Sequence, residues 1–395
     1  MKICFITSSF PRYIGDTSAP WLLKTAKELK KMGVEVSVFA PSYNGIKQKL
    51  IDGIPIYRFR YFFKSSEKLT HEESSSARLN ELKYKILIIC YIFSGCLNSF
   101  FYFRKNKFDV ITVHWPFPQA IFGIIGKYLT GAKLVYHFYA SEMLLIRNRF
   151  IKTLFNFFML FADHIVTISS FTENVIKNEL KFKSPVSIIP FSSSLPDNII
   201  TEVSYPNENK SKILKLLFVG RLIERKGILY FLEAIKNLTE RRIPVSVTII
   251  GEGYQKELVK KFILENGLEK YIILKGEVPI PDLVNEYKEC DIFVFPSITD
   301  KRGDTEGLGC VIIEALMYKK PVIASNVGGV VDIVKDNVTG FLVPEKDPLE
   351  LVKKILFIRD NYDFAKQIAE NGYNYVIKNF SWDVIVTKLL KVYQR

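Results

Sequence analysis

Short apolar runs alternate with longer amphipathic stretches through the first half of the chain. The longer stretches place apolar residues at helical spacing, and one of them, WLLKTAKELKKMG, ends at Gly33, a common helix stop. Strands that alternate with helices predict a parallel sheet in an α/β domain. The runs that we expect to form strands lie at 3–7, 34–40, 110–113, 133–136, 165–168 and 187–189.

The alternation stops once and then begins again. Residues 192–212, SSSLPDNIITEVSYPNENKSK, show no periodicity and are mostly polar, as domain linkers are. We therefore predict two doubly wound, parallel-sheet domains, at 1–195 and 213–375, joined by a linker at 196–212. A last amphipathic stretch follows at about 376–395. The strands expected in the second domain lie at 215–219, 245–250, 272–274, 292–295, 322–324 and 340–343.

Composition and charge narrow the class of protein. With 395 residues, the chain exceeds the roughly 250–300 residues at which a single core stops growing. The net charge of +14 suits an anionic partner, but the basic residues are dispersed, so we do not expect nucleic acid. The five cysteines show no CxxC pair, which argues against a zinc site or a disulfide framework. The opening MKICFITSSFP reads as a buried strand rather than a signal peptide, so we expect a cytoplasmic protein.

One segment is more apolar than the rest. Residues 86–103, ILIICYIFSGCLNSFFYF, are flanked by basic residues and reach the lower length limit for a membrane span. Three interpretations stay open: a transmembrane helix, a buried core helix, or a helix that lies in the membrane interface. A second aromatic and basic stretch, NRFIKTLFNFFMLFADH, lies at 148–164. Together the two stretches favour peripheral contact with an anionic membrane.

The residues that follow the strands are the candidate ligand contacts, because ligands of doubly wound sheets bind at the carboxyl ends of the strands. Arg221 and Lys226 follow the first strand of the second half, at the start of a helix whose free N–H groups would also face an anion. An isolated pair of this kind is more often a solvated basic loop. Gly251 follows the next strand, where a tight turn explains a glycine as well as a ligand does.

Two glutamates flank the start of a later helix, in TEGLGCVIIEALM at 305–317. Glu306 precedes the predicted helix, and Glu314 lies about five residues inside it, roughly 8 Å along its axis. Carboxylates on either side of free N–H groups suit a ligand with hydroxyls at both ends and phosphate between them, such as a nucleoside diphosphate sugar. The alternative is a first-turn dipole partner followed by an ordinary solvated helix residue.

The order and spacing of these motifs resemble the donor-binding half of retaining glycosyltransferases of family 4. The motifs are GRLIERKG, GEG, FPS, EGLGCVIIEAL, KPVIAS, VGG and DNVTGFLV. The resemblance implies a GT-B fold, in which two Rossmann-like domains face a central cleft and a closing helix packs back on the first domain. It also implies that the first domain binds the acceptor and that the reaction needs neither a metal nor another cofactor.

The resemblance assigns roles to single residues of the second half. Arg221 and Lys226 match residues that hold the donor diphosphate. Glu314 matches one that hydrogen-bonds the ribose, and Glu306 matches one that contacts the transferred sugar, which it would orient rather than attack. The remaining donor-binding positions that we predict are Gly15, Gly220, Gly251, Gly307, Leu308 and Gly309.

The first half matches the family less closely. His114 and Trp115, in DVITVHWPFPQ, are similar to the family's His-Trp segment and are assigned to the acceptor side. In LVYHFYASEM, matching the strands without a gap places Tyr139 at the family's histidine and Glu142 at its acid, on the acceptor side. A locally shifted loop would bring His137 there instead, so both Tyr139 and His137 are candidate catalytic residues. A histidine buried in the core is the third interpretation of His137.

We therefore expect a retaining glycosyltransferase that moves a hexose-type sugar from a UDP- or GDP-linked donor to a lipid-linked or saccharide acceptor. Its expected setting is cell-surface polysaccharide, lipopolysaccharide or glycolipid synthesis at the cytoplasmic face of the membrane. Two alternatives stay open: a nucleotide-sugar 2-epimerase of the same fold, and a non-catalytic protein that binds nucleotide sugars. A nicotinamide-dependent enzyme is not expected, because no G-x-G-x-x-G follows the first strand of either half.

Overall fold

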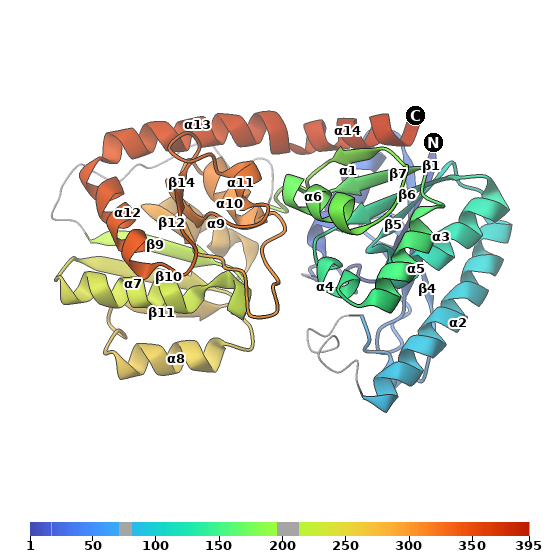
Figure 1. The fold of residues 1–395 in the computed structure, drawn as a ribbon, viewed down its shortest axis with the longest axis horizontal. Coiled ribbons are helices and arrows are strands. Elements are labelled where there is room, and N and C mark those ends of the chain that lie inside the picture. Colours follow the sequence, from blue (N-terminus) through green and yellow to red (C-terminus); the bar gives the residue numbers. More distant parts are fainter. Residues whose placement is uncertain (17, 71–80, 196–212, 395) are drawn as a thin grey trace. The chain divides into compact units, whose positions relative to one another are not determined.

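The chain forms two α/β units (Figure 1). Unit 1 comprises Met1–Ser194 together with Trp382–Arg395, and unit 2 comprises Leu195–Ser381. The chain therefore passes from unit 1 to unit 2 and back again. The predicted linker at 196–212 lies outside the described residues. The computed structural model describes residues 1–16, 18–70, 81–195 and 213–394.

The apolar runs of the first half of the chain form the sheet of unit 1. In the described residues it has eight strands in the order β3-β4-β2-β1-β5-β6-β7-β8. β1 lies inside the sheet, with Ile3 opposite Val36 of β2 on one side and Val110 of β5 on the other, both in parallel register. β3 pairs antiparallel with β4, in a hairpin that the sequence pattern did not predict. The strands are β1 (Lys2–Thr7), β2 (Glu35–Pro41), β3 (Leu50–Ile51), β4 (Ile54–Phe59), β5 (Val110–His114), β6 (Lys133–Phe138), β7 (His164–Thr167) and β8 (Val186–Ile188).

Helices cover both faces of this sheet and create two cores. On one face, α2, α3 and α5 bury large aromatic side chains such as Tyr91, Phe122 and Phe155. On the other face, Trp382 of α14 shares a core with Leu22 of α1. The helices of unit 1 are α1 (Pro20–Lys31), a 3-10 turn (Lys64–Ser66), α2 (Leu82–Lys105), α3 (Pro116–Thr130), α4 (Met143–Ile146), α5 (Arg149–Met159), α6 (Ser170–Glu179) and α14 (Trp382–Gln394).

α2 contains the long apolar segment, and apolar residues occupy both its inner and its outer face. The inner face packs so closely that a Cβ atom at Gly95 would lie 2.1 Å from the ring of Phe122 in α3. On the outer face, the exposed fraction is 67% for Ile89, 71% for Phe93 and 50% for Leu97. α2 has the length and composition of a membrane span, and 28% of its most apolar 18-residue window is buried. The expectation of a buried core helix is therefore wrong for the outer face, while the inner face belongs to the core of unit 1.

Unit 2 is a second parallel sheet between helices. In the described residues its order is β11-β10-β9-β12-β13-β14, and its core joins aliphatic residues of β9, α7 and α12. The strands are β9 (Leu214–Val219), β10 (Val245–Ile250), β11 (Ile272–Gly276), β12 (Ile292–Phe295), β13 (Val322–Ser325) and β14 (Phe341–Val343). The helices are a 3-10 turn (Glu224–Lys226), α7 (Ile228–Glu240), α8 (Lys256–Glu265), α9 (Ile280–Glu289), α10 (Cys310–Met317), α11 (Val330–Ile333), α12 (Pro348–Asp360) and α13 (Tyr362–Phe380).

Candidate active site

The strand order of unit 2 reverses between β9 and β12. From β9 the sheet continues through β10 and β11 in one direction, and from β12 it continues through β13 and β14 in the other. Ligands of doubly wound sheets bind at such a reversal, outside the carboxyl ends of the two strands. The segments there are 220–227 after β9 and 296–309 after β12, which contain most of the predicted donor-binding residues.

Two glycines let other loops approach the loop after β9 closely. Gly227 has a φ of 66°, and a Cβ atom there would lie 1.9 Å from the carbonyl oxygen of Pro296. Gly251 has a φ of 134°, and a Cβ atom there would lie 2.0 Å from the carbonyl oxygen of Gly220. Neither position has room for a side chain, and both conformations favour glycine. Gly227 therefore brings the loops after β9 and β12, and the charged residues they carry, into contact, and Gly251 brings the loop after β10 against the loop after β9.

Lys226 and Glu306 form a buried ion pair between these loops. Their exposed fractions are 8% and 7%, and Lys226 Nζ donates to Glu306 Oε2. Arg225 donates to the same oxygen from Nη1, 3.0 Å away, and its Nε lies 3.4 Å from Asp304 Oδ2. The ring of Phe295 lies 4.7 Å from Lys226 Nζ. Two cations thus converge on one carboxylate oxygen at the strand reversal.

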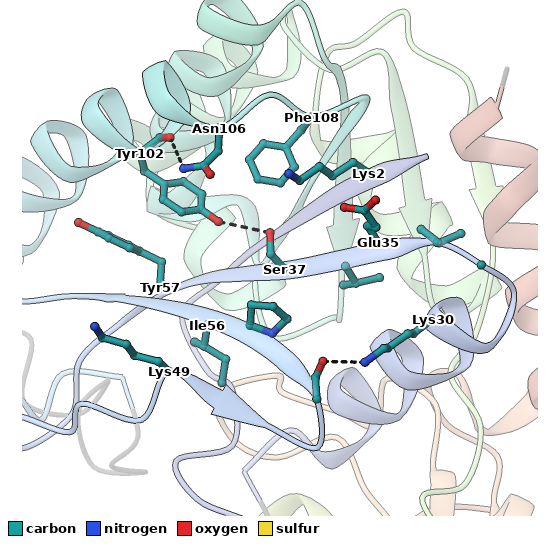
Figure 2. Close-up of a pocket in the computed structure, with 15 residues that line it drawn as sticks. Lys2, Lys30, Glu35, Ser37, Lys49, Ile56, Tyr57, Tyr102, Asn106 and Phe108 are labelled. Atoms are coloured by element: carbon teal, nitrogen blue, oxygen red, sulfur yellow. Dashed lines mark hydrogen bonds between the residues drawn. The ribbon is translucent and has the colours of Figure 1, made fainter.

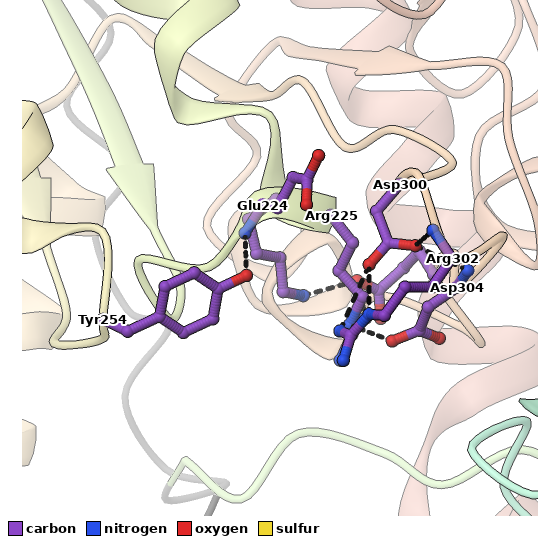
Figure 3. Close-up of polar contacts among 8 residues, drawn as sticks. Glu224, Arg225, Tyr254, Asp300, Arg302 and Asp304 are labelled. Atoms are coloured by element: carbon purple, nitrogen blue, oxygen red, sulfur yellow. Dashed lines mark hydrogen bonds and ion pairs between the residues drawn. The ribbon is translucent and has the colours of Figure 1, made fainter. Parts of the chain in front are cut away.

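Hydrogen bonds within the protein hold the loop that carries Asp304 and Glu306 in place. Asp300 Oδ1 accepts hydrogen bonds from the backbone N–H groups of Arg302, at 2.8 Å, and Asp304, at 2.9 Å. Figure 3 shows Asp300, Arg302 and Asp304 gathered beside Arg225. The carbonyl oxygen of Glu306 accepts a hydrogen bond from the N–H of residue 329 at 2.9 Å. These hydrogen bonds therefore fix the positions of the Asp304 and Glu306 carboxylates.

Burial and the neighbouring charges together set the pKa values of Lys226 and Glu306. Burial lowers the pKa of Lys226, the carboxylate of Glu306 raises it and Arg225 lowers it, which leaves it at about 8. Burial raises the pKa of Glu306, but Lys226 and Arg225 outweigh burial and hold it at about 2. At pH 7 the pair is therefore ionised. An anionic ligand that approaches Lys226 competes with Glu306 for its ammonium group.

α10 begins within the same loop. Gly309 precedes it in the left-handed conformation, with a φ of 92°, and residues 306–309 are all buried. Glu314 lies inside α10 at 6% exposure, and its Oε2 accepts a hydrogen bond from the hydroxyl of Tyr287 at 2.9 Å. The interpretation of Glu314 as an ordinary solvated residue is therefore wrong.

The two cations predicted after β9 lie in different environments. Lys226 is buried, whereas the side chain of Arg221 is exposed. Arg221 still lies close enough for its charge to lower the pKa of both Lys226 and Glu306. The interpretation of the pair as a solvated basic loop is wrong for Lys226. Arg225 and Tyr287 were not predicted as site residues, although Arg225 stands beside Lys226 in the motif IERKG.

In unit 1 the predicted residues gather at the carboxyl ends of β5 and β6. His114 Nδ1 lies 2.6 Å from the hydroxyl of Tyr139, and the rings of His114 and His137 are 4.5 Å apart. Tyr139 is half-buried in the loop after β6, whereas His137 is buried within β6, with Nε2 3.4 Å from the hydroxyl of Tyr393 in α14. Burial lowers the pKa of both histidines, that of His137 to about 3. Both imidazoles are therefore neutral at pH 7.

Trp115 and Glu142 complete this group. The rings of Trp115 and Tyr139 are 4.6 Å apart. Trp21 lies 6.2 Å from each of these rings and stacks on Phe191 at 4.9 Å. The carboxylate of Glu142 accepts a hydrogen bond from the N–H of Tyr139 at 3.1 Å, and burial raises the pKa of Glu142 to about 7. The aromatic neighbours Trp21 and Phe191 were not predicted from the sequence.

Gly15 lies in the loop that follows β1, beside β5, where the strand order of unit 1 reverses. It has a φ of 89°, and no atom lies within 4 Å of the position that a Cβ atom would take. The neighbouring Asp16 forms an ion pair with Arg12, in which Oδ2 and Nε are 2.7 Å apart. Gly15 therefore lies in an open part of the loop, at a place where ligands bind in such sheets.

Comparison with known proteins decides the family. The model of Glycosyltransferase Family 4 matches residues 21–191, and that of Glycosyl transferases group 1 matches residues 201–375. The chain belongs to the family 4 type of GT-B glycosyltransferases. The two matches correspond to the two units, so each half of this glycosyltransferase carries part of the family pattern.

Individual proteins agree with this assignment. An uncharacterized glycosyltransferase of Methanocaldococcus jannaschii is 28% identical over 74% of this chain and 76% of its own. A GDP-mannose-dependent alpha-(1-6)-phosphatidylinositol monomannoside mannosyltransferase of Mycobacterium tuberculosis is 28% identical over 43% of this chain and 45% of its own. Anabaena HepE, crystallised with UDP and glucose, has a TM-score of 0.72 at 18% identity and covers 99% of both chains. The structural likeness confirms the prediction of a GT-B fold with two parallel-sheet domains.

Proposed function

We propose that this glycosyltransferase moves a hexose-type sugar from a UDP- or GDP-linked donor to a lipid-linked or saccharide acceptor, with retention and without a metal. The observation that carries the proposal is the buried pair of Lys226 and Glu306 at the strand reversal of unit 2. Two relatives support it by their names. One depends on GDP-mannose and acts on a phosphatidylinositol mannoside, and the other was crystallised with UDP and glucose.

The charges at this site suit the departure of a nucleoside diphosphate. When the bond between the anomeric carbon and the phosphate oxygen breaks, an electron pair moves to the diphosphate, and fixed cations stabilise it. We assign this role to Lys226 and Arg221, together with the N–H groups at the start of α10. Arg225 also binds Glu306, so the carboxylate keeps a cationic partner when Lys226 turns to the diphosphate.

The two glutamates would hold the two ends of the donor. Glu314, anchored by Tyr287, accepts from the ribose hydroxyls, and Glu306 accepts from a hydroxyl of the sugar. The acceptor hydroxyl attacks the anomeric carbon on the face that the diphosphate leaves, and its proton passes to the departing phosphate oxygen. In this reaction Glu306 orients the sugar and forms no bond to it. Tyr139 and the neutral His114 and His137 would lie on the acceptor side.

We place the acceptor at the inner face of the cell membrane, as part of cell-surface polysaccharide or glycolipid synthesis. Apolar side chains on the outer faces of α2 and α5 support this location: Phe93 and Leu97 in α2, and Phe150 and Phe157 in α5, at 71% and 52% exposure. Both helices contact α3, so they belong to one helical layer. Basic residues that attract anionic lipid flank these side chains: Lys83, Lys85, Arg104, Lys105, Arg149 and Lys152.

A donor screen tests the reaction. Thermal shift against UDP, GDP and their sugars should identify a stabilising ligand, because a ligand of the folded state raises stability by mass action. Release of nucleoside diphosphate that depends on an acceptor, unchanged by EDTA, supports a metal-independent transferase. Formation of a 2-epimer marks an epimerase, and binding without turnover marks a non-catalytic protein. The anomeric configuration of the product, read by NMR, decides between retention and inversion.

Replacement of Glu306 tests its role in that reaction. We expect Glu306→Ala to lower kcat more than tenfold, since the carboxylate orients the reacting sugar. Glu257→Ala, at a surface position of α8, is the matched control and should leave turnover unchanged. Turnover of Glu306→Ala within about threefold of the parent, a loss of about 0.7 kcal/mol, would show that the carboxylate does not act on the sugar.

Vesicle flotation tests the membrane contact. The protein should float with vesicles that contain 30% phosphatidylglycerol, and salt should weaken this binding. Phe93→Ser with Leu97→Ser removes apolar groups from α2 and should weaken binding at least tenfold. Leu258→Ser with Leu264→Ser also replaces two exposed apolar side chains by serine, in α8, and serves as the control. A parent protein that stays unbound at low salt refutes the proposed contact.

A further inference from the structure

A pocket of about 650 Å³ lies in unit 1, away from the residues described so far (Figure 2). It is lined by the first residues of β1 and β2, including Lys2 and Ser37, by the hairpin of β3 and β4, and by the last turns of α2. His114 and Tyr139 lie at the opposite, carboxyl ends of the parallel strands. The pocket is therefore separate from the proposed reaction site.

The wall of the pocket nearest α2 is aromatic and held in place by polar contacts. The rings of Tyr57 and Tyr102 are 4.8 Å apart, and Tyr102 stacks on Phe108 at 5.9 Å. The hydroxyl of Tyr57 donates to Asn98 in α2 at 2.9 Å. The hydroxyl of Tyr102 lies 3.3 Å from that of Ser37. The volume falls in the range of about 300–1,000 Å³ typical of small-molecule sites.

Three lysines also line the pocket: Lys2, Lys30 and Lys49. In the described parts of the chain, no carboxylate forms an ion pair with any of them, and Lys30 Nζ instead donates to the carbonyl of residue 53 at 2.9 Å. The contrast with the other lysines of α1 is clear, because Lys24, Lys27 and Lys31 all pair with carboxylates. The lining has one acidic residue, Glu35, and thus carries a net positive charge.

We propose that this pocket holds the phosphate head group of an anionic phospholipid. The inference rests on the proposed contact of α2 with the membrane and adds to it a binding site for one lipid head group. Tyr102 of α2 and Asn106, which follows α2, line the pocket. Asn98 of α2, which accepts a hydrogen bond from Tyr57, directly follows the exposed Leu97. A lipid can therefore place its phosphate among the lysines while its acyl chains follow the apolar face of α2. Such a site would fix the orientation of unit 1 on the bilayer, which diffuse charge attraction cannot do.

A soluble lipid tests the pocket without a membrane. In calorimetric titrations of the full chain, dihexanoyl phosphatidylglycerol below its micelle concentration should bind saturably, and inorganic phosphate at least tenfold more weakly. Lys30→Glu with Lys49→Glu should weaken lipid binding more than tenfold. Lys181→Glu with Lys183→Glu makes the same charge change elsewhere on unit 1 and should leave it within twofold.

A variant that fills the pocket distinguishes binding inside the pocket from attraction to a positively charged surface. Pro55→Trp keeps all three lysines but places an indole among the lining residues, and it should also weaken lipid binding more than tenfold. Melting temperatures within 3 °C of the parent would show that each variant is folded. Lipid binding that survives both Pro55→Trp and the pocket charge reversal, or phosphate that binds as tightly as the lipid, overturns the inference.

The same variants separate this inference from the membrane proposal. Phe93→Ser with Leu97→Ser should lose vesicle binding and keep the short-chain lipid, because the pocket is intact. Vesicle binding without short-chain lipid binding would refute the pocket and leave the membrane contact standing. Short-chain lipid binding without vesicle binding would refute the contact of α2 with the bilayer and support a head-group site alone.

Discussion

Replacing Lys226 with arginine should move the alkaline limb of donor turnover to higher pH. Burial leaves the pKa of Lys226 at about 8, whereas a guanidinium stays charged to above about pH 12. Between pH 7 and 9 the charged fraction of a group with a pKa of about 8 falls from about nine-tenths to about one-tenth. If the ammonium form holds the diphosphate, kcat/KM of the parent should therefore fall about tenfold over this range.

A second variant, Glu306→Gln, should move the alkaline limb of donor turnover to lower pH. The carboxylate of Glu306 raises the pKa of Lys226, so Glu306→Gln removes that effect while burial and Arg225 continue to lower the pKa. The midpoint of the loss of kcat/KM should then lie below the parent's midpoint near pH 8. Opposite movement in Lys226→Arg and Glu306→Gln is a signature that a general loss of stability does not produce.

The assay measures nucleoside diphosphate release at donor concentrations well below KM, because kcat/KM reports the groups of the free enzyme. The position of the limb, rather than the absolute rate, is the result that counts. Lys260→Arg, the same replacement at the surface of α8, should reproduce the parent profile. A limb that stays near pH 8 in Lys226→Arg would show that another group titrates and refute the assignment.

Two further variants test how the site is held together. Tyr287→Phe removes the hydrogen bond to the buried Glu314 and should lower the free energy of unfolding by about 1.5–3 kcal/mol and raise the donor KM, measured by urea unfolding and donor titration. An unchanged KM would contradict its role in positioning Glu314. Gly227→Ala sets a Cβ atom against the carbonyl of Pro296 and should lower the melting temperature more than Gly267→Ala, whose φ of 62° costs about 1–2 kcal/mol without any close contact. Equal shifts would contradict the close packing of the loops.

The sequence predicted most of the two sheets because their strands are short, buried and rich in β-branched residues. Segments such as 3–7 and 245–250 are short apolar runs next to amphipathic helices, and a buried strand is the simplest interpretation of such a run. The hairpin of β3 (Leu50–Ile51) and β4 (Ile54–Phe59) was missed. The two residues of β3 leave no periodic signal, whereas buried positions alternate along the first residues of β4, a pattern that could have predicted it. The exposure of α2 was equally hidden, because a helix that is apolar on both faces does not reveal which one meets the core.

The sequence predicted several residues of the candidate site but not the contacts between them. Lys226 and Glu306 could be named from motifs that follow strands, and the two sheet reversals place such residues at an edge where ligands bind. Lys226 and Glu306 are 80 residues apart in the sequence, and Tyr287 and Glu314, which form a hydrogen bond, are 27 residues apart. Pairings at such separations depend on how helices and loops pack in three dimensions. Local spacing does not encode them.

α14 determines the order in which the nascent protein can be completed. Trp382, Ile385 and Leu389 belong to the core of unit 1, and Trp382 Nε1 donates to the carbonyl of Ser193 at 2.8 Å. The ribosome releases these residues only after the whole of unit 2. Multidomain chains generally fold from the amino terminus during synthesis, but here the continuous second unit is the first that can finish. Until α14 emerges, the apolar face of α1 that packs against it stays uncovered, so the core of unit 1 cannot be completed before unit 2 has been synthesised.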